Sequence, residues 1–382
     1  MAEKARESNA NGATTVDGAM TAGTGATGRA KRPRIADVAR AAGVSKTAVS
    51  FAFNSPERLN PETAERILEV ADELGYRPHP VARMLTQRRT GTIGILTPQA
   101  LSVVFSNPFF SLFNEGVAAA AESSGHALLF FSPLHGSLAR AVGRSTVDGF
   151  VAVGLPEGHP EIEQIQRAGL PTILVDSTAF PAHGSVLVDD ETGARLAAEH
   201  IVGLGHRNVL VVGVEPPAPM TRHSPDGVMG RRLGAYRDAL SSAGIDLVDE
   251  RVLVGPASID GGVTCLRRAW EDGLRPTAIL AMSDAMAIGV MHAAEEFGLS
   301  IPRDLSVVGF DDIDIARYTN PPLTTIRQPV RRKGEEAVRL LLAQLDQHPA
   351  APERVMLPTR LIVRGTTAPA PSLREEVGVA AS

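Results

Sequence analysis

The sequence predicts a small all-α domain of the helix-turn-helix type, followed by an α/β body with parallel, doubly wound sheets. Helical apolar periodicity with an internal turn signal occupies residues 34–76, which predicts the small domain. Short apolar runs then alternate with helical patterns over some 240 residues, which is typical of parallel sheets covered by helices. A change in charge between the two parts supports their division into separate domains.

The overall composition is that of a soluble globular chain. Of the 382 residues, 43% are hydrophobic and 21% are charged. No apolar run reaches the ~18 residues that a membrane span needs, and residues 1–28 lack the apolar core of a secretion signal. Cys265 is the only cysteine, so an internal disulfide and a cysteine-based metal site are excluded. We therefore expect a cytoplasmic protein with no cofactor, no bound metal and no membrane partner.

Charge is distributed unevenly along the chain. The formal net charge of −5 argues, taken alone, against a nucleic-acid partner. Residues 29–89, however, contain 12 basic and seven acidic side chains, whereas residues 90–382 contain 24 basic and 33 acidic ones. A basic module favours phosphate binding, because each neutralised phosphate releases counterions. The alternative is that these charges form an ordinary solvated face.

Composition and pattern divide the chain into five segments. Residues 1–30 are small and polar and bury too little surface to fold, so we expect a disordered tail there and another at 369–382. Residues 31–77 form the predicted helix-turn-helix domain, residues 78–90 a hinge, and residues 91–368 the α/β body.

Three helices are predicted in the small domain. The first is interrupted by Gly43, whose permissive backbone suits a tight turn. Ser45 is a good N-cap for the second helix, since its hydroxyl accepts hydrogen bonds from amides of the first turn. The third helix runs from Pro61 to Tyr76. The apolar positions are Ile35, Val38, Ala39 and Ala42 in the first helix, Val49 in the second, and Ile67, Val70, Ala71 and Leu74 in the third.

The second helix of a helix-turn-helix lies in the major groove of DNA. The side chains expected at the bases are Lys46, Thr47, Ser50 and Phe51, and those expected near phosphate are Ser45 and Asn54. The alternative is an αα-hairpin without a ligand, because a short turn pattern is a weak signal by itself.

The hinge carries a second signal. Prolines at 78 and 80 end regular helix, and residues 81–85 then predict one or two helical turns, which are marginal alone. Leu85 could insert between base steps in the minor groove and kink the duplex. The alternative is a plain linker in which Leu85 packs on the body.

The body alternates strands and helices. Apolar runs predict strands at 92–96, 127–131, 149–153, 172–176, 186–188, 208–214, 277–281 and 305–309. Helical patterns cover 113–124, 161–168, 192–204, 231–243, 262–271, 285–297 and 332–345. Ligands of such sheets bind at the carboxyl ends of the strands. The polar residues that follow strands, and that we expect to line one cleft, are Asp176, Asp189, Asp190, Ser283, Asp284, Asp311 and Asp312.

Several motifs along residues 35–366 carry a family resemblance. They include Asp37-Val38-Ala39-Arg40-Ala41-Ala42-Gly43-Val44-Ser45, Leu74-Gly75-Tyr76-Arg77-Pro78, Asn107-Pro108-Phe109-Phe110, Arg232-Leu233-Gly234-Ala235-Tyr236 and Pro321-Pro322-Leu323-Thr324-Thr325-Ile326. With these motifs the chain resembles the lactose-repressor-like (LacI/GalR) family of transcriptional regulators. The resemblance implies a homodimer that binds a pseudopalindromic double-stranded operator. It also implies an effector in a cleft between two periplasmic-binding-protein-like subdomains, an N-subdomain (about 91–188 and 327–350) and a C-subdomain (about 189–326 and 351–368).

The resemblance further implies residue roles. Lys46 and Thr47 match the family's base-reading positions. The positions expected at the minor groove or beside it are Tyr76, Val81, Ala82 and Leu85, and those expected at the effector are Phe109, Asp176, Arg232, Ser283 and Asp311. A carboxylate and an arginine together suit a hydroxyl-rich ligand. The alternative is that Arg232 and Asp311 only bridge the subdomains.

The chain departs from the family pattern at several positions. Arg34 stands where a threonine usually caps the first helix, so we expect a weaker cap and a phosphate contact. Phe51 replaces an arginine, which removes a donor but permits contact with a thymine methyl. Ala235 replaces a glycine. The segment 135–146 is shorter than is usual in the family, so we expect a shorter surface helix there. The chain also lacks a leucine-rich tail that would hold a tetramer together, so we expect a dimer.

We therefore predict a transcriptional repressor, not an enzyme, whose operator affinity responds to a small polar metabolite such as a sugar or nucleoside. The aromatic content of 4% disfavours a large apolar ligand. The alternative is a cytoplasmic solute-binding or sugar-modifying protein without operator function.

Overall fold

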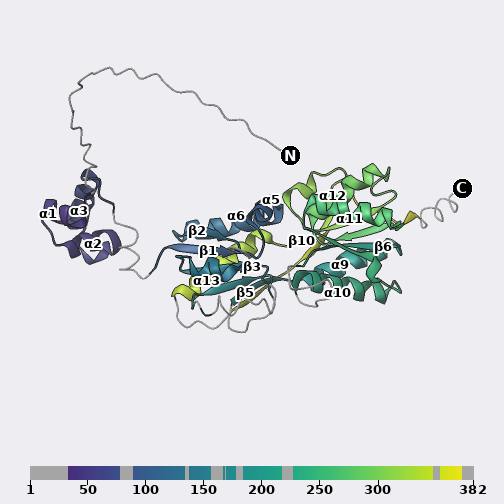
Figure 1. Cartoon of the computed structure of the whole chain (residues 1–382), viewed down its shortest axis with the longest axis horizontal. Helices are drawn as coiled ribbons and strands as arrows, with labels where there is room; N and C mark the ends of the chain where they lie inside the picture. Colours follow the sequence, from purple (N-terminus) through teal and green to yellow (C-terminus); the bar gives the residue numbers. More distant parts are fainter. Residues whose placement is uncertain are drawn as a thin grey trace, which may run out of the picture. The chain divides into compact units, whose positions relative to one another are not determined.

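The computed structural model describes residues 33–77, 89–133, 137–155, 167, 169–177, 184–216, 227–346 and 353–371. The chain forms two compact units, Met1–Gln87 and Arg88–Ser382. Figure 1 draws the described residues of the first in purple and those of the second in blue to yellow. The predicted N-terminal tail and the expected minor-groove residues Val81, Ala82 and Leu85 lie outside the described residues. Those expectations stay predictions.

The described part of the first unit consists of three α-helices and a short 3-10 helix. These are α1 (Ile35–Ala41), α2 (Lys46–Asn54), η1 (Pro56–Arg58) and α3 (Pro61–Glu73). Val38, Val49 and Ile67, one from each α-helix, are fully buried against one another, as the apolar periodicity predicted. The prediction for Leu74 was wrong: α3 ends at Glu73, so Leu74 lies beyond the helix and is exposed. Gly43 has φ +67°, which lets the chain turn sharply between α1 and α2.

The first helix lacks a side-chain cap at its N-cap residue, as expected for Arg34. The Asp37 carboxylate compensates, because it accepts a hydrogen bond from the Arg34 backbone amide at 2.9 Å. This half of a capping box orients the helix start and leaves the Arg34 side chain exposed.

The described part of the second unit contains two six-stranded sheets. The first has the order β11-β5-β4-β3-β1-β2 and the second the order β12-β10-β9-β8-β6-β7. The strands of the first are β1 (Thr92–Leu96), β2 (Ala127–Phe131), β3 (Gly149–Val153), β4 (Thr172–Val175), β5 (Gly184–Val188) and β11 (Arg354–Leu357). Those of the second are β6 (Val209–Val214), β7 (Val252–Gly255), β8 (Ala278–Ala281), β9 (Ser306–Asp311), β10 (Thr324–Arg327) and β12 (Arg360–Ile362). The pairings are parallel except for β10 with β12.

Helices cover both faces of the second sheet (Figure 1). They are α9 (Asp190–Gly203) and α10 (Gly227–Ser242) on one face, and α11 (Ile259–Glu271) and α12 (Asp284–Glu296) on the other. Alternation along β6 explains this arrangement: Leu210 and Val212 pack under α11 and α12, and Val209 and Val211 under α9 and α10. A strand that is apolar on both faces is typical of a parallel sheet.

The first sheet is covered in the same way. Its helices are α5 (Leu101–Ser106), α6 (Pro108–Ser123), α7 (Leu138–Gly143) and α13 (Val330–Asp346). Helices α6 and α13 pack so closely at Gly116 that a Cβ atom there would overlap the carbonyl oxygen of Arg331. The absence of a side chain at Gly116 therefore permits this contact. On the opposite face, α7 packs on Phe150 and Leu174. The doubly wound parallel architecture predicted from the alternating pattern is confirmed.

The chain passes between the two sheets near residues 188–190, 327–330 and 357–360. The first sheet with its helices forms the N-subdomain, and the second with its helices forms the C-subdomain. The predicted boundary at 350/351 was wrong, because β11 pairs with β5 and therefore belongs to the N-subdomain. The predicted C-terminal tail also began too early. Ala370 is buried, and its amide donates to the Leu204 carbonyl at 2.8 Å.

Some elements differ from the prediction. Helix α6 begins at Pro108 rather than Phe113, because the Asn107 side chain caps it. Helices α5 and α7 and strands β7, β10, β11 and β12 were not predicted, since their apolar runs are short. The prediction for residues 161–166 lies outside the described residues. In the described part of the chain, no helix is both long and apolar enough to span a bilayer.

Candidate functional site

The N-terminal turn of α2 presents a polar surface. Ser45 caps the helix by accepting from the Ala48 amide at 3.0 Å, and Ser45, Lys46 and Thr47 are exposed. Val49, two residues later, is completely buried and fixes which face of α2 points outward. The structure therefore places the predicted base-reading residues Lys46 and Thr47 where a partner can reach them.

The remaining predicted contacts on α2 are half-buried. Asn54 donates to the Ser50 hydroxyl at 3.4 Å, and the Arg58 guanidinium lies 5.3 Å from the centre of the Phe51 ring. Arg58 thus places a cation beside Phe51, the position at which the family resemblance led us to expect an arginine. Sequence reasoning missed Arg58, because it lies outside the helix in η1.

Tyr76 has a structural role that the sequence did not predict. Only 8% of it is exposed, and its ring packs edge-to-face on Phe53 with centroids 5.8 Å apart. Burial raises the pKa of its hydroxyl. Its ring therefore helps to attach the end of the three-helix unit to α2.

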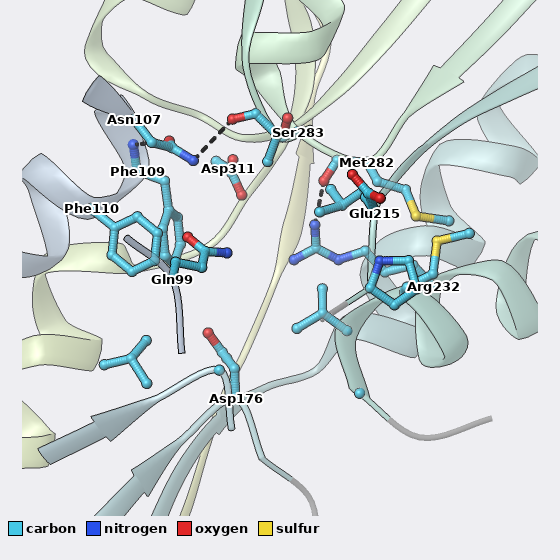
Figure 2. Close-up of a pocket in the computed structure, with 18 of the residues that line it drawn as sticks. Gln99, Asn107, Phe109, Phe110, Asp176, Glu215, Arg232, Met282, Ser283 and Asp311 are labelled. Atoms are coloured by element: carbon cyan, nitrogen blue, oxygen red, sulfur yellow. Dashed lines mark hydrogen bonds between the residues drawn. The ribbon is translucent and has the colours of Figure 1, made fainter. Parts of the chain in front are cut away.

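In the second unit a pocket of about 170 Å³ lies between the N-subdomain and the C-subdomain. The structure brings all five predicted effector residues into its lining: Phe109, Asp176, Arg232, Ser283 and Asp311. Figure 2 shows Phe109 and Phe110 facing Arg232 across the pocket, with Asp176 at its base. The lining also includes Gln99, Asn107, Glu215, Ala257, Met282 and Gln328.

Strand ends explain why these residues meet. Asp176 follows β4 and Asp311 ends β9, and both have positive φ values, +61° and +125°. Ser283 follows β8 and caps α12 by accepting from the Met286 amide at 3.2 Å. Parallel strands end at one edge of a sheet, so loops of both sheets contribute to one cleft. The left-handed backbone at two aspartates is strained and turns their side chains into this cleft.

Arg232 is held rigidly by its neighbours. It is 4% exposed, its Nε donates to Asp190 at 2.8 Å, and its guanidinium also donates to the Met282 carbonyl. The guanidinium lies 3.5 Å from the centre of the Phe310 ring. Burial lowers its pKa, but the Asp190 and Asp311 carboxylates outweigh burial and raise it. These partners belong to the C-subdomain, so the contacts of Arg232 do not bridge the subdomains.

Two carboxyl groups beside the pocket are strongly perturbed. Burial, with the nearby Asp311 charge, raises the pKa of Asp284 to about 8. Asp284 accepts hydrogen bonds from the Thr325 hydroxyl at 2.5 Å and from the Ile313 amide at 2.9 Å. Burial also raises the pKa of Asp311 to about 6, while Arg232 and Gln328 oppose this rise. At neutral pH we therefore expect a mostly neutral Asp284 next to a charged Asp311.

Lys333 is a site residue that sequence reasoning missed. It lies in the first turn of α13, is 1% exposed, and donates to both Asp176 oxygens at 2.8 and 2.9 Å. It also donates to the Gln328 side-chain oxygen at 2.7 Å. The local sequence is rich in charged residues, which is typical of a solvent-exposed helix face. Nothing in it therefore indicates that Lys333 is buried at the pocket. No cluster of three or more metal-ligating side chains occurs among the described residues.

Comparison with known proteins finds a matching family profile for each of the two units. The profile described as "Bacterial regulatory proteins, lacI family" matches residues 34–79, and "Periplasmic binding protein-like domain" matches residues 198–367. The chain is 31% identical to the HTH-type transcriptional repressor PurR of Vibrio vulnificus (strain CMCP6), over 87% of this chain and 98% of the relative. The chain belongs to the LacI family of bacterial transcriptional regulators.

Other members of the LacI family are similar over nearly their whole length. The ribose operon repressor of Escherichia coli (strain K12) is 30% identical over 86% of this chain and 98% of the relative. The solved lac repressor dimer bound to operator shares 28% identity and a TM-score of 0.76, over 88% of this chain and all of that one. The complex of the regulator CelR with cellobiose shares 27% identity and a TM-score of 0.65, with the same coverage. This chain is thus a LacI-type DNA-binding regulator, and the relatives are regulators rather than enzymes.

Proposed function

We propose that this LacI-family regulator is a repressor whose operator affinity is controlled by a small polar ligand in the pocket between its subdomains. The observation that carries the proposal is the pocket itself. Side chains from separate strand ends and helices, which the strand pattern and the family resemblance predicted for an effector, converge there. The exposed N-terminal turn of α2 supports the DNA-binding part of the proposal, since such a surface suits the major groove.

The lining favours a ligand with several hydroxyl groups. Asp176 and Asp311 offer carboxylate acceptors, and the Ser283 hydroxyl adds a further polar group. Phe109 and Phe110 offer apolar faces on the same wall, where the carbon faces of a sugar ring can pack. The names of solved relatives support this class, since they include complexes with cellobiose and with ribose.

A homodimer is part of the proposal. Strand β2 is an edge strand of the first sheet, and Leu129 on it is 45% exposed. Val103 and Phe105 on α5 are 48% and 59% exposed, and the Phe105 ring contacts the Phe130 ring edge-to-face. An apolar patch next to an open sheet edge favours a protein interface. A second copy of the chain is the occupant that we propose, by analogy with the solved dimeric relative.

The decisive experiment is footprinting of the full-length protein on the DNA upstream of its own gene. We expect a protected pseudopalindrome that is released, or strengthened, by one ligand from a panel that includes ribose and cellobiose. Uniform protection without sequence preference would contradict the proposal.

A further inference from the structure

Lys333 stands behind the pocket and touches three residues of its wall. Its ammonium donates to Asp176 and to Gln328, and lies 5.1 Å from the centre of the Phe109 ring. Gln328 in turn donates to Asp311 at 2.6 Å. A continuous set of contacts therefore joins the carboxylate of the N-subdomain wall to the carboxylate of the C-subdomain wall.

All three ammonium protons of Lys333 have acceptors: two Asp176 oxygens and one Gln328 oxygen. A buried ammonium is tolerated only when it is paired and fully hydrogen-bonded, and this one is. The ion pair holds the Asp176 carboxylate in one orientation and cancels its charge at the base of the pocket.

The rest of the buried charge around the pocket is also balanced. On the C-subdomain side, Asp190 accepts from Arg231 at 2.6 Å and from Arg232 at 2.8 Å. Asp311 lies in the field of Arg232 and of Lys333. Burial favours the neutral form of Asp284, so the buried carboxylates of Asp176, Asp190 and Asp311 face the buried cations Arg232 and Lys333 and the half-buried Arg231. Glu215, which lines the pocket, is exposed to solvent.

From this geometry we propose that Lys333 is a positioning residue whose ion pair with Asp176 sets the charge selectivity of the pocket. Because the two charges cancel, the pocket accepts an uncharged, hydroxyl-rich ligand, and Asp176 keeps the Lys333 ammonium from attracting phosphorylated or otherwise anionic ones. The proposal rests on the proposed function in taking this pocket as the effector site. Lys333 acts through Asp176, Gln328 and Phe109 rather than by contact with the ligand.

Inorganic phosphate is a probe that needs no knowledge of the ligand. Asp176→Asn leaves the Lys333 ammonium without its anion, so the base of the pocket gains a net positive charge. In a phosphate-free buffer at pH 7.5, adding 10 mM phosphate should raise the melting temperature of full-length D176N by about 3 °C. Wild type and the double variant D176N/K333M should not respond, because neither has an unpaired cation there.

The outcomes separate clearly. A phosphate response of wild type equal to that of D176N would overturn the proposal, and so would a response that persists in D176N/K333M. Arg332→Met, on the neighbouring exposed residue, is the matched control and should behave as wild type.

A second arm covers the case in which D176N does not fold. Lys333→Met leaves the buried Asp176 carboxylate without its cation. The melting temperature of K333M should fall by about 5 °C or more at pH 7.5, because a buried carboxylate is left without its cation. Adding Asp176→Asn to K333M should restore stability. An unchanged melting temperature of K333M, or a loss that Asp176→Asn does not rescue, would contradict the proposal. Specific operator binding by the same wild-type sample tests the proposed function separately.

Discussion

The Asn107 side chain joins the two subdomains across the pocket. Its Nδ2 donates to the Ala257 carbonyl of the C-subdomain at 3.1 Å, while its Oδ1 accepts from the Phe109 amide at 3.0 Å and caps α6 (Figure 2). One residue therefore fixes the ligand-facing Phe109 and also holds the cleft together on the side of α6. We therefore expect a ligand that opens or closes the cleft to change this hydrogen bond.

Asn107→Asp separates these two functions. The carboxylate keeps the helix cap but lacks the N–H donor and faces the Ala257 carbonyl, so the closed arrangement should lose about 1 kcal/mol or more. We expect fluorescence energy transfer between dyes on cysteines at Glu122 and Glu271 to shift toward the open state. Cys265 is buried and should react slowly. Asn107→Ser, which removes the Nδ2 group that reaches Ala257 without adding a charge, should give a smaller shift. An unchanged transfer efficiency in both variants would show that the bond does not hold the cleft.

Lys46→Ala should weaken operator binding about 5- to 150-fold if Lys46, at the exposed end of α2, makes the base contact that we predict for it. Gel-shift titrations at several salt concentrations measure this loss. Arg66→Ala, on the exposed surface of α3, is the control and should have little effect. Equal affinities for wild type and K46A would remove Lys46 from the DNA interface.

Arg232→Gln should abolish the ligand response but not operator binding, because the site lies in the second unit. It should also lower the free energy of unfolding by about 3 kcal/mol, since Asp190 loses one of its two buried cations. Urea unfolding and ligand-dependent gel shifts measure the two effects. Arg237→Gln breaks an exposed pair with Asp249 and serves as the control. A normal ligand response in R232Q would reject its assigned role.

Stability should depend on pH through Asp284. Its pKa is about 8 in the folded chain, against an ordinary value of 3.8. Between these values the folded chain binds the extra proton, so the free energy of unfolding should fall as pH rises, by at most about 1.4 kcal/mol per pH unit. Asp284→Asn should flatten the slope between pH 6 and pH 8 in urea unfolding, whereas the exposed Asp272→Asn should not. A slope that is unchanged in D284N would assign the dependence to other groups.

Phe105→Glu should disrupt the proposed dimer, because it puts a charge into the apolar patch beside β2. Sedimentation velocity should show a monomer at concentrations where wild type is dimeric, and operator affinity should fall about tenfold or more as the two half-sites lose their linked binding. Met356→Glu places the same charge on β11 at the opposite edge of the sheet and should leave the dimer intact. A dimeric F105E would move the interface elsewhere.

The fold was largely predictable because its signals are local. The apolar spacing of Val38, Val49 and Ile67, and the short apolar strands of the body, specify three helices and two parallel sheets. Strands β11 and β12 were missed, since three or four residues carry little periodicity and their sheets are chosen by partners far away in sequence. The same weakness misplaced the boundary at 350/351.

For the pocket, the sequence by itself determined which polar residues follow strands and therefore which side chains gather at the sheet edges. Asp176, Ser283 and Asp311 were found in this way, and the family resemblance added Phe109 and Arg232. The same pattern was wrong for the other four residues expected in the cleft, which are not in the pocket lining: Asp189, Asp190, Asp284 and Asp312. Only the tertiary structure decided what these groups pair with. Lys333 is 157 positions from Asp176, and Asn107 is 150 from Ala257. Such contacts depend on how the returning helix α13 and the loop before α11 pack in three dimensions. Burial then converts an ordinary charged residue into one that sets the charge of the cleft.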